Sequence, residues 1–422
     1  MRVLWFTNTP SLATELLSLE NYGGGWILSL QKLVEKVEDL DLGIAFHHGT
    51  LGIKEINLNG TSYYAIPQPA DENKLIRLIK RWKHIVEPET QIHNYLNIID
   101  SFKPDLIHVF GSEQAFGLIC EKTTIPVVLQ IQGNLTVYSK KWFSGLSRFQ
   151  VLRYSNIKLL LKAYGIWHDY FPFTKRALRE QRIFANCRFF IGRTDWDKRI
   201  TKTLSNSATY FHCDEPLREE FFKPEWISNS DKLPVLFSTI KPSTFKGLET
   251  ILETAYILTI KKGLNFEWNI AGIDKNEEII RIIEKICKTS FKENHIFFLG
   301  SIGPQKLSEQ LLASACFVHP SHIENSPNSV CEAMLLGMPI VATNSGGTPS
   351  LLDNNKEGLL VQDGDPYAMA GAILEIVENP DFAENLGKSA RKRAQERHNP
   401  EKILEDLLAI YHQVLSESSI KK

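Results

Sequence analysis

The stretch HPSHIENSPNSVCEAMLLGMP, residues 319–339, carries two carboxylates eight positions apart across a junction between a loop and a helix. Ser326 and Pro327 are favoured at the N-cap and the first helical position, so a helix is predicted to start here and run through Glu332. The helix dipole and its first N–H groups favour a phosphate. Because carboxylates accept hydrogen bonds from hydroxyl groups, Glu324 and Glu332 are suited to hold a sugar and a ribose. The alternative is that Ser-Pro only caps a helix and both glutamates are solvated.

Length and composition predict a globular chain with two domains. A chain of 422 residues exceeds one ordinary core, and 43% of its residues are hydrophobic. The net charge of −1 argues against a nucleic-acid-binding protein whose whole surface is basic. Six scattered cysteines without a Cys-x-x-Cys pair indicate reduced thiols in a cytosolic setting. No segment approaches the roughly 20 apolar residues that span a bilayer, so any membrane role is expected to be peripheral.

Apolar segments alternate with amphipathic helical segments twice along the chain, which predicts an α/β fold with parallel sheets. The expected strands are 3–7, 42–47, 106–110, 127–132 and 189–192 in the first round, and 235–238, 267–271, 296–299, 316–320 and 339–343 in the second. The segment 213–232 is rich in charge, Pro and Ser and is interpreted as a linker. We therefore expect Rossmann-like doubly wound domains over 1–224 and 225–399, and a C-terminal helix over 400–422 that packs back across their interface.

Further motifs follow the two glutamates in a specific order. They are Gly337-Met338-Pro339, the loop TNSGGTP at 343–349, Glu357-Gly358, and Asp363-Gly-Asp-Pro366, with the turn Gly23-Gly24-Gly25 near the N-terminus. With this order and spacing, nearly the whole chain resembles glycosyltransferase family 4, which has the GT-B architecture of two Rossmann-like domains facing a cleft. The resemblance implies a retaining, metal-independent enzyme of bacterial glycan assembly. Such an enzyme moves a sugar from a nucleoside diphosphate to a glycan or lipid-linked glycan acceptor in cell-surface polysaccharide synthesis.

The resemblance also implies roles for individual residues. Glu324 matches the glutamate that binds the donor sugar, and Glu332 matches the one that binds the ribose. Lys241 and Lys246 match an Arg and a Lys that stabilise the leaving diphosphate, so Lys241 supplies charge without the bidentate fork of Arg. The alternative is that both are surface lysines on a loop. The residues expected to catalyse are Lys241, Lys246 and Glu324, and those expected to bind the donor are Gly24, Gly25, Gln132, Ser301, Ile302, Asn325, Ser326, Asn328, Ser329 and Glu332.

Gln132 departs from the family pattern, which often has a histidine after the strand at 127–132. Glutamine hydrogen-bonds a hydroxyl but does not exchange protons as histidine does. We interpret Gln132 as a positioning residue, with the leaving phosphate taking the acceptor's proton. Two other classes stay open: a sugar-nucleotide epimerase or hydrolase of the same architecture, and a catalytically silent partner that binds sugar nucleotides.

The segment 138–184 carries ten basic residues against two acidic ones, with aromatic residues interleaved. One interpretation is a basic aromatic insertion of the N-terminal domain that binds an anionic membrane surface and a lipid-linked acceptor. This would place a cytoplasmic enzyme at the inner face of the membrane. The other is a lid whose aromatics form a small local core. No nucleic-acid motif accompanies the segment, so nucleic acid is not an expected partner.

Patterns that elsewhere indicate a metal are interpreted as structural. Asp39-Leu-Asp41 is expected to end a helix, and Asp363-Gly-Asp365 to cap the helix that starts at Pro366. His319 is expected to end a strand, and neither it nor His322 has a partner at metal-ligand spacing. We therefore expect no cofactor and no required metal.

Overall fold

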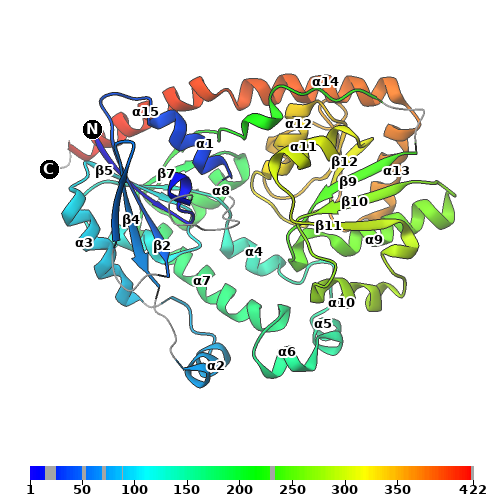
Figure 1. Ribbon diagram of the computed structural model, residues 1–422, viewed down its shortest axis with the longest axis horizontal. Helices are drawn as coiled ribbons and strands as arrows, with labels where there is room; N and C mark the ends of the chain where they lie inside the picture. The colour runs from blue at the N-terminus through cyan, green and yellow to red at the C-terminus, as the bar shows by residue number, and fades with distance from the viewer. Residues whose placement is uncertain (15–24, 50–53, 69–72, 88, 229–232, 420–422) are drawn as a thin grey trace. The chain divides into compact units, whose positions relative to one another are not determined.

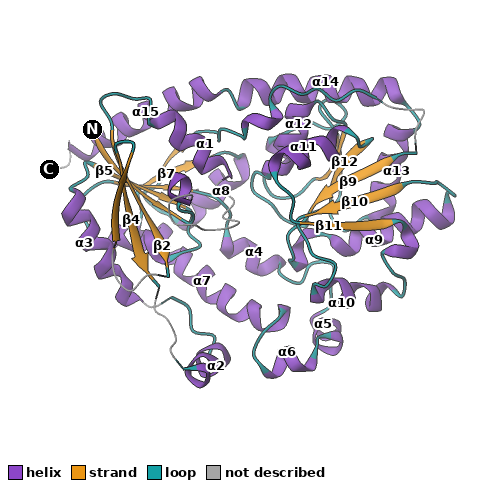
Figure 2. Ribbon diagram, viewed as in Figure 1, coloured by secondary structure: helices purple, strands orange, loops and turns teal. Residues whose placement is uncertain are grey.

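The computed structural model describes residues 1–14, 25–49, 54–68, 73–87, 89–228 and 233–419, which form two compact units (Figure 1). Unit 1 comprises Met1–Thr136, Phe171–Pro216 and His398–Lys422, and unit 2 comprises Val137–Tyr170 and Leu217–Arg397. Each unit is a sheet with helices on both of its faces, and its strands are parallel except for β3 of unit 1 (Figure 2). The predicted α/β class with two Rossmann-like domains is therefore confirmed.

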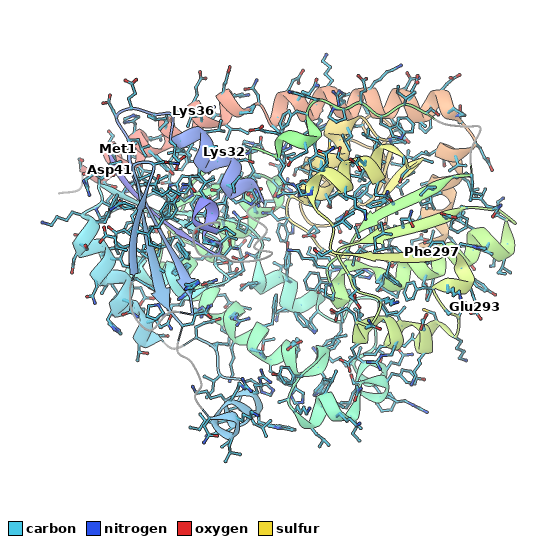
Figure 3. The ribbon with its side chains drawn as sticks, viewed as in Figure 1. Met1, Lys32, Lys36, Asp41, Glu293 and Phe297 are labelled. Carbon is cyan, nitrogen blue, oxygen red and sulfur yellow. The ribbon has the colours of Figure 1, made fainter. Side chains whose placement is uncertain are left out.

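Unit 1 holds an eight-stranded sheet in the order β3-β4-β2-β1-β5-β6-β7-β8. The strands are β1 Arg2–Thr7, β2 Asp41–His48, β3 Lys54–Leu58, β4 Thr61–Pro67, β5 Leu106–Phe110, β6 Val127–Gln130, β7 Phe189–Gly192 and β8 Thr209–His212. All neighbours are parallel except β3 and β4. At the amino ends of β1 and β2, Met1 and Asp41 lie side by side, and the Asp41 N–H donates to the Met1 carbonyl at 2.9 Å (Figure 3).

Strand β1 shows why this sheet is buried on both faces. Val3 and Trp5 point into one apolar core and Leu4 and Phe6 into another, because successive side chains of a strand alternate between faces. The helices of unit 1 are α1 Gly25–Val34, α2 Lys74–Trp82, α3 Ile92–Phe102, α8 Asp195–Leu204 and α15 Pro400–Ser419, and α7 Ile166–Asn186 enters it at Phe171.

The C-terminal helix α15 belongs to the core of unit 1. Its Tyr411 hydroxyl accepts from Trp5 Nε1 at 3.1 Å and lies 2.7 Å from His108 Nδ1. Burial lowers the pKa of His108 to about 3, so this imidazole is neutral. The predicted packing of this helix across an interface stays a prediction.

Unit 2 holds a six-stranded parallel sheet in the order β11-β10-β9-β12-β13-β14. The strands are β9 Val235–Thr239, β10 Glu267–Ala271, β11 Ile296–Gly300, β12 Cys316–His319, β13 Ile340–Thr343 and β14 Leu359–Val361. The helices are α4 Leu135–Lys141 (its first two residues in unit 1), α5 Arg148–Tyr154, α6 Ile157–Leu161, α9 Leu248–Tyr256, α10 Glu278–Cys287, α11 Pro304–Leu312, α12 Asn328–Leu336, α13 Pro366–Val377 and α14 Pro380–Arg397. None of the helices that the structure describes is both long and apolar enough to cross a membrane.

The division into units differs from the predicted domains in two places. The chain enters unit 2 at residue 217, not 225, because Leu217, Phe221 and Trp226 of the expected linker are buried in the core of unit 2. Residues 137–170, expected to be part of an N-terminal insertion, also belong to unit 2, where Leu146 and Val151 join the same core. In both places scattered apolar side chains without clear periodicity decide where the backbone packs.

Candidate functional site

The predicted catalytic residues gather at one edge of the sheet of unit 2. Lys241 and Lys246 follow β9 and Glu324 follows β12, and these two parallel strands are neighbours. The chain fills the sheet from β9 outward to β11 on one side, and then from β12 to β14 on the other. The carboxyl ends of β9 and β12 therefore flank the switch point where doubly wound sheets bind their ligands.

Lys246 and Glu324 form an ion pair through Nζ and Oε1, with 18% and 15% of their side chains exposed. The other oxygen, Oε2, accepts from the Tyr138 hydroxyl at 3.4 Å. Gly247 brings the two loops together: its φ is 72°, and a Cβ there would come within 2.1 Å of the Pro320 carbonyl oxygen. Any larger residue would separate the loop that follows β9 from the loop that follows β12.

Burial and, as the smaller cause, the positive charge of the nearby Lys241 together lower the pKa of the Lys246 ammonium to about 7. The negative charge of Glu324 favours the ammonium form and opposes both effects. Lys241 itself is exposed. A phosphate arriving beside the two lysines would stabilise the charged form of Lys246 and raise its pKa again.

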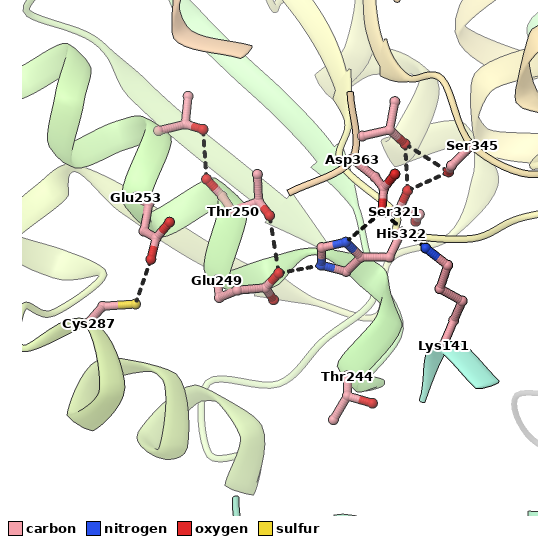
Figure 4. Close-up of polar contacts among 12 residues, drawn as sticks. Lys141, Thr244, Glu249, Thr250, Glu253, Cys287, Ser321, His322, Ser345 and Asp363 are labelled. Carbon is pink, nitrogen blue, oxygen red and sulfur yellow. Dashed lines mark hydrogen bonds and ion pairs between the residues drawn. The ribbon is translucent and has the colours of Figure 1, made fainter. Parts of the chain in front are cut away.

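The glycine loop at 343–349 holds the backbone of Glu324. Gly346 has a φ of 57°, and a Cβ on it would come within 2.0 Å of the Glu324 carbonyl oxygen. The next residue, Gly347, donates its N–H to that oxygen at 2.8 Å. The hydroxyls of Thr343 and Ser345 donate to the Ser321 carbonyl at 2.5 and 2.9 Å (Figure 4). The glycines thus fix the position of the loop that carries the glutamate.

The helix between the two glutamates starts one residue later than predicted. Pro327 is the N-cap residue, with an extended backbone (ψ 112°), and α12 begins at Asn328. The expected N-cap at Ser326 is therefore wrong. Pro327 is the N-cap because its ψ is extended and its carbonyl accepts a hydrogen bond from Val330 N at 3.0 Å. Asn325 is buried, whereas Ser326, Asn328 and Ser329 are half-buried. These residues occupy the predicted place between Glu324 and Glu332.

Glu332 is buried in α12 and bound by an arginine that we did not predict. Its Oε1 accepts from Arg218 Nε at 2.9 Å and from Arg218 Nη2 at 2.6 Å. Burial raises the pKa of the Glu332 carboxyl, and Arg218 opposes that rise. Arg218 lies in the segment interpreted as a linker, where one arginine among many charges gives no signal of its own. The only clue in the sequence is that a buried carboxylate needs a cation.

His322 connects the loop after β12 to the segment 137–170. Its Nε2 lies 2.5 Å from Glu249 Oε1 and its Nδ1 lies 3.4 Å from Asp363 Oδ2, which in turn lies 3.5 Å from Lys141 Nζ (Figure 4). Burial lowers the pKa of His322, but the hydrogen bonds and charges of the two carboxylates outweigh it, so the net pKa is raised. Gly145 sits against this group: a Cβ there would come within 2.2 Å of Glu249 Oε1. The histidine therefore positions the loop two residues before Glu324.

Asp365 and His319 have the structural roles that we expected, whereas Asp363 contacts His322 and Lys141 instead of capping a helix. Asp365 caps α13 by accepting from Tyr367 N at 3.0 Å and Ala368 N at 2.9 Å. His319 ends β12, where burial, assisted by Lys246, lowers its pKa to about 3.

Ser301 and Ile302 follow the edge strand β11, two strands away from β9. Ser301 is exposed, and Ile302 packs on the core of unit 2. Their predicted main-chain contacts with a base stay a prediction.

Unit 1 carries the remaining predicted residues. Gly25 begins α1 with a φ of 44°, and a Cβ on it would meet nothing within 4 Å; Gly24 lies outside the described residues. Gln132 lies two residues beyond the end of β6, and its carbonyl accepts from Arg193 Nη2 at 3.1 Å. Glu113, which we did not predict, folds against Gly111 beside Gln132. Burial raises the pKa of Glu113 to about 7, and it has the same effect on the Glu215 carboxyl, which also lies near Gln132.

Residues 218–393 match the profile of the family described as Glycosyl transferases group 1. The matched residues lie within unit 2, so this part of the chain resembles the group 1 glycosyltransferases. The chain is 32% identical over 176 residues to the capsular polysaccharide biosynthesis glycosyltransferase CapM of Staphylococcus aureus. That alignment covers 42% of this chain and 45% of CapM, so the chain spans less than half the length of this curated relative.

Two solved structures extend the likeness to the whole chain. Sucrose-phosphate synthase from Thermosynechococcus elongatus superposes with a TM-score of 0.70 and 16% identity over 99% of this chain and 100% of that one. HepE of Anabaena, solved with UDP and glucose, gives a TM-score of 0.65 and 14% identity over 98% and 99%. At this identity the likeness shows the fold alone, which is GT-B.

Proposed function

We propose that the protein is a retaining glycosyltransferase of the family 4 type. It would transfer a sugar from a nucleoside diphosphate to a glycan or lipid-linked glycan acceptor in cell-surface polysaccharide synthesis. The observation that carries the proposal is the Lys246–Glu324 pair at the switch point of the sheet of unit 2. The name of CapM supports the biosynthetic setting, and the UDP and glucose bound by HepE support the donor class.

The donor's diphosphate would lie between the two lysines and the first N–H groups of α12. Lys246, and Lys241 beside it, would neutralise the charge that develops on the diphosphate as its bond to the anomeric carbon breaks. The helix dipole would add to this stabilisation. Because the lysines supply the positive charge, we propose that transfer requires no metal.

The two glutamates would hold the ends of the donor. Glu324 would leave Lys246 and accept from the sugar hydroxyls, while Lys246 turns to the phosphate. Glu332, held by Arg218, would accept from the ribose hydroxyls. In retaining transfer the acceptor hydroxyl attacks on the face that the diphosphate leaves, and its proton passes to the departing phosphate oxygen. Gln132 would then position a hydroxyl without exchanging protons.

Unit 1 offers a site for an anionic acceptor. A cavity of about 500 Å³ lies near the carboxyl ends of its strands, where His47 is the penultimate residue of β2 and Gln68 follows β4. Four basic residues line it: Arg77, Lys80, Arg81 and Arg176. Its one carboxylate, Glu87, lies 2.8 Å from Arg176 and from Arg179. The excess of positive charge suits a phosphate or carboxylate on the acceptor.

We further propose that the protein is cytoplasmic and attaches peripherally to the inner face of the membrane through the segment 138–184. Part of this segment forms the predicted local core: Phe143 packs on Trp167 and Tyr170, with ring centroids 6.3 and 5.1 Å apart. Other apolar side chains are open to solvent, with Phe149 and Ile157 69% and 71% exposed. The ring contacts thus support a lid with a small local core, and the exposed side chains support membrane binding. The exposed apolar side chains favour an anionic lipid surface over nucleic acid as the partner.

The proposal is tested by incubating the protein with a panel of nucleoside diphosphate sugars, with and without membrane extract, in buffer containing EDTA. Transfer of the sugar to extract components, with the anomeric configuration retained by NMR, is the expected result. Isomerised or hydrolysed donor would favour an epimerase or hydrolase. Binding of donor without any product would favour the silent partner.

A further inference from the structure

Helix α2 is amphipathic, with its apolar face open to solvent. None of its nine residues is buried, and Leu75, Ile76, Ile79 and Trp82 are 62%, 49%, 45% and 49% exposed. At 100° per residue these four side chains fall within one third of the helix circumference. Ile85, three residues after the end of α2, is 53% exposed as well.

Part of the charged face of α2 is directed toward the body of unit 1. Arg77, Lys80 and Arg81 line the cavity that also contains Glu87 and Arg176. An amphipathic helix of a protein surrounded only by water has the opposite orientation, with its apolar face on the core and its charges outside. The orientation of α2 indicates that something other than water covers the apolar face.

The helix is held in place by contacts outside its apolar face. Asn73 caps its first turn by accepting from Leu75 N at 2.8 Å. Lys175 of α7 donates to the carbonyls of Lys83 and His84, both at 2.8 Å, and the His84 ring stacks on Phe171 with centroids 4.5 Å apart. A helix of nine residues is marginal in water by itself, so these anchors present a preformed apolar surface.

The charges of this segment favour a lipid surface over a protein partner. Residues 73–85 contain five basic side chains and no acidic one. A helix with Leu, Ile and Trp on one face and Lys and Arg on the other is typical of those that lie in the interface of an anionic bilayer. Trp82 stands at the end of the apolar face, and its amphipathic ring suits the headgroup depth.

We propose that α2 lies in the surface of an anionic membrane, with Leu75, Ile76, Ile79 and Trp82 among the acyl chains and its basic side chains level with the headgroups. The inference deepens the proposed peripheral attachment and rests on it, but it does not depend on sugar transfer. The apolar face of α2 would share or replace the role assigned above to the segment 138–184.

The test is co-sedimentation of the full chain with phosphatidylcholine vesicles, with and without phosphatidylglycerol, in the absence of any donor. The Leu75→Ser/Ile79→Ser variant should partition onto the anionic vesicles at least about tenfold less than wild type. The reason is that each apolar side chain buried among the acyl chains increases the affinity for the vesicle by about this factor. Ile260→Ser, at a side chain 63% exposed in unit 2 and outside the segment 138–184, is the matched control and should bind as wild type. Far-UV circular dichroism and thermal unfolding should be unchanged in both, since α2 buries no residue.

A second variant separates this inference from the proposed attachment through 138–184. Ile157→Ser/Leu161→Ser removes two exposed apolar side chains of α6, which are 71% and 66% exposed. If this variant loses binding and the α2 variant does not, the inference about α2 is overturned while peripheral attachment stands. Wild type that does not bind anionic vesicles overturns both. If wild type dimerises through α2 and the Leu75→Ser/Ile79→Ser variant is monomeric but still binds vesicles, a second copy of the chain covers the face instead.

Discussion

Lys246 is subject to two opposing electrostatic effects. Burial and the charge of Lys241 disfavour its ammonium form, whereas Glu324 and, in the proposed reaction, the donor diphosphate favour it. A buried cation in this position is stabilised when an anion binds beside it. This stabilisation increases as negative charge develops on the leaving group. Replacing Lys246 by Ala should therefore lower kcat/KM, and the loss of transition-state stabilisation should be roughly 2–4 kcal/mol. Steady-state transfer assays measure this, and near-normal turnover of the variant would contradict the assigned role.

The same lysine predicts a pH dependence of nucleoside diphosphate binding. Below pH 7 the ammonium of the free protein is already charged, so binding requires no proton. As pH rises through the pKa of about 7, Lys246 of the free protein loses its proton. Binding of the nucleoside diphosphate then requires that Lys246 takes up a proton. The association constant should fall by up to about tenfold per pH unit above 7. Isothermal calorimetry at pH 7, 8 and 9 measures it, and Lys246→Arg, which keeps its charge, should show a flat profile.

The two glutamates should differ in which ligand they affect. Glu332→Gln should weaken both the free nucleoside diphosphate and the donor, because the ribose is common to the two ligands. Glu324→Gln should weaken the donor more, because only the donor carries the sugar. Loss of a charge-assisted hydrogen bond of this kind corresponds to roughly 1.5–3 kcal/mol. Calorimetry with both ligands on both variants separates the roles, and equal losses for every combination would refute the division between sugar and ribose.

An Arg218 variant tests whether Glu332 itself, and not its arginine partner, binds the nucleoside diphosphate. Arg218→Lys keeps a cation beside the buried carboxylate but loses the second hydrogen bond to Oε1. Nucleoside diphosphate binding should weaken less in this variant than in Glu332→Gln. A larger loss would indicate that Arg218 itself contacts the ligand.

At the scale of elements, the group of His322, Glu249, Asp363 and Lys141 joins four parts of unit 2. The loop after β12 holds His322, α9 holds Glu249, and the loop before α13 holds Asp363, which contacts Lys141 of α4. His322→Ala would leave the buried Glu249 carboxylate without its cation, and breaking such a pair costs about 3–5 kcal/mol. Chemical denaturation should show this loss at pH 6.

The stabilisation by His322 also has a predictable sign with pH. The folded-state pKa is raised above its ordinary value of 6.5, so the contribution is fully present below pH 6.5 and is lost as pH rises through the raised pKa. The difference in unfolding free energy between wild type and His322→Ala should shrink from pH 6 to pH 9. A difference that stays constant would show that His322 is neutral in the folded protein.

The elements that sequence reasoning found are those with a strong local pattern. Apolar runs identified strands such as β1 and β9, and the Ser-Pro signal located the start of α12 to within one residue. The hairpin of β3 and β4 was missed although Asn59-Gly60 joins its strands, because both strands are too mixed in polarity to stand out. Helix α2 was also missed, although its apolar residues repeat at helical spacing.

The site could be predicted only as far as its motifs are contiguous. Glu324, Lys246 and the glycines near them belong to short patterns, and the structure brings them together. The partners that complete the site come from distant parts of the chain: Tyr138 meets Glu324 and Arg218 meets Glu332. Which residue reaches a buried carboxylate is decided by packing across the unit, and no spacing along the chain encodes it.

At the scale of the whole molecule, the chain leaves unit 2 at Arg397 and ends in unit 1. Helix α15 buries Ile403, Leu407, Ile410, Tyr411 and Val414 in the core of unit 1. At about 1.5–3 kcal/mol for each large apolar side chain, their combined contribution is similar to the whole net stability of a domain. Truncation after Arg397 should therefore unfold unit 1, whereas unit 2 keeps its own core.

Differential scanning calorimetry and limited proteolysis would measure this outcome. The truncated chain should lose the transition of unit 1 and release a protected fragment containing 217–397, and UDP should still raise the melting temperature of that fragment if its donor site is intact. Tyr411→Phe is the milder version: it removes the hydroxyl that Trp5 and His108 share and leaves buried polar groups unpaired, which costs about 1–3 kcal/mol. Since Tyr411 lies in unit 1, this variant should lower only the transition that truncation abolishes. A single transition that shifts as a whole in both variants would mean that the two units unfold cooperatively.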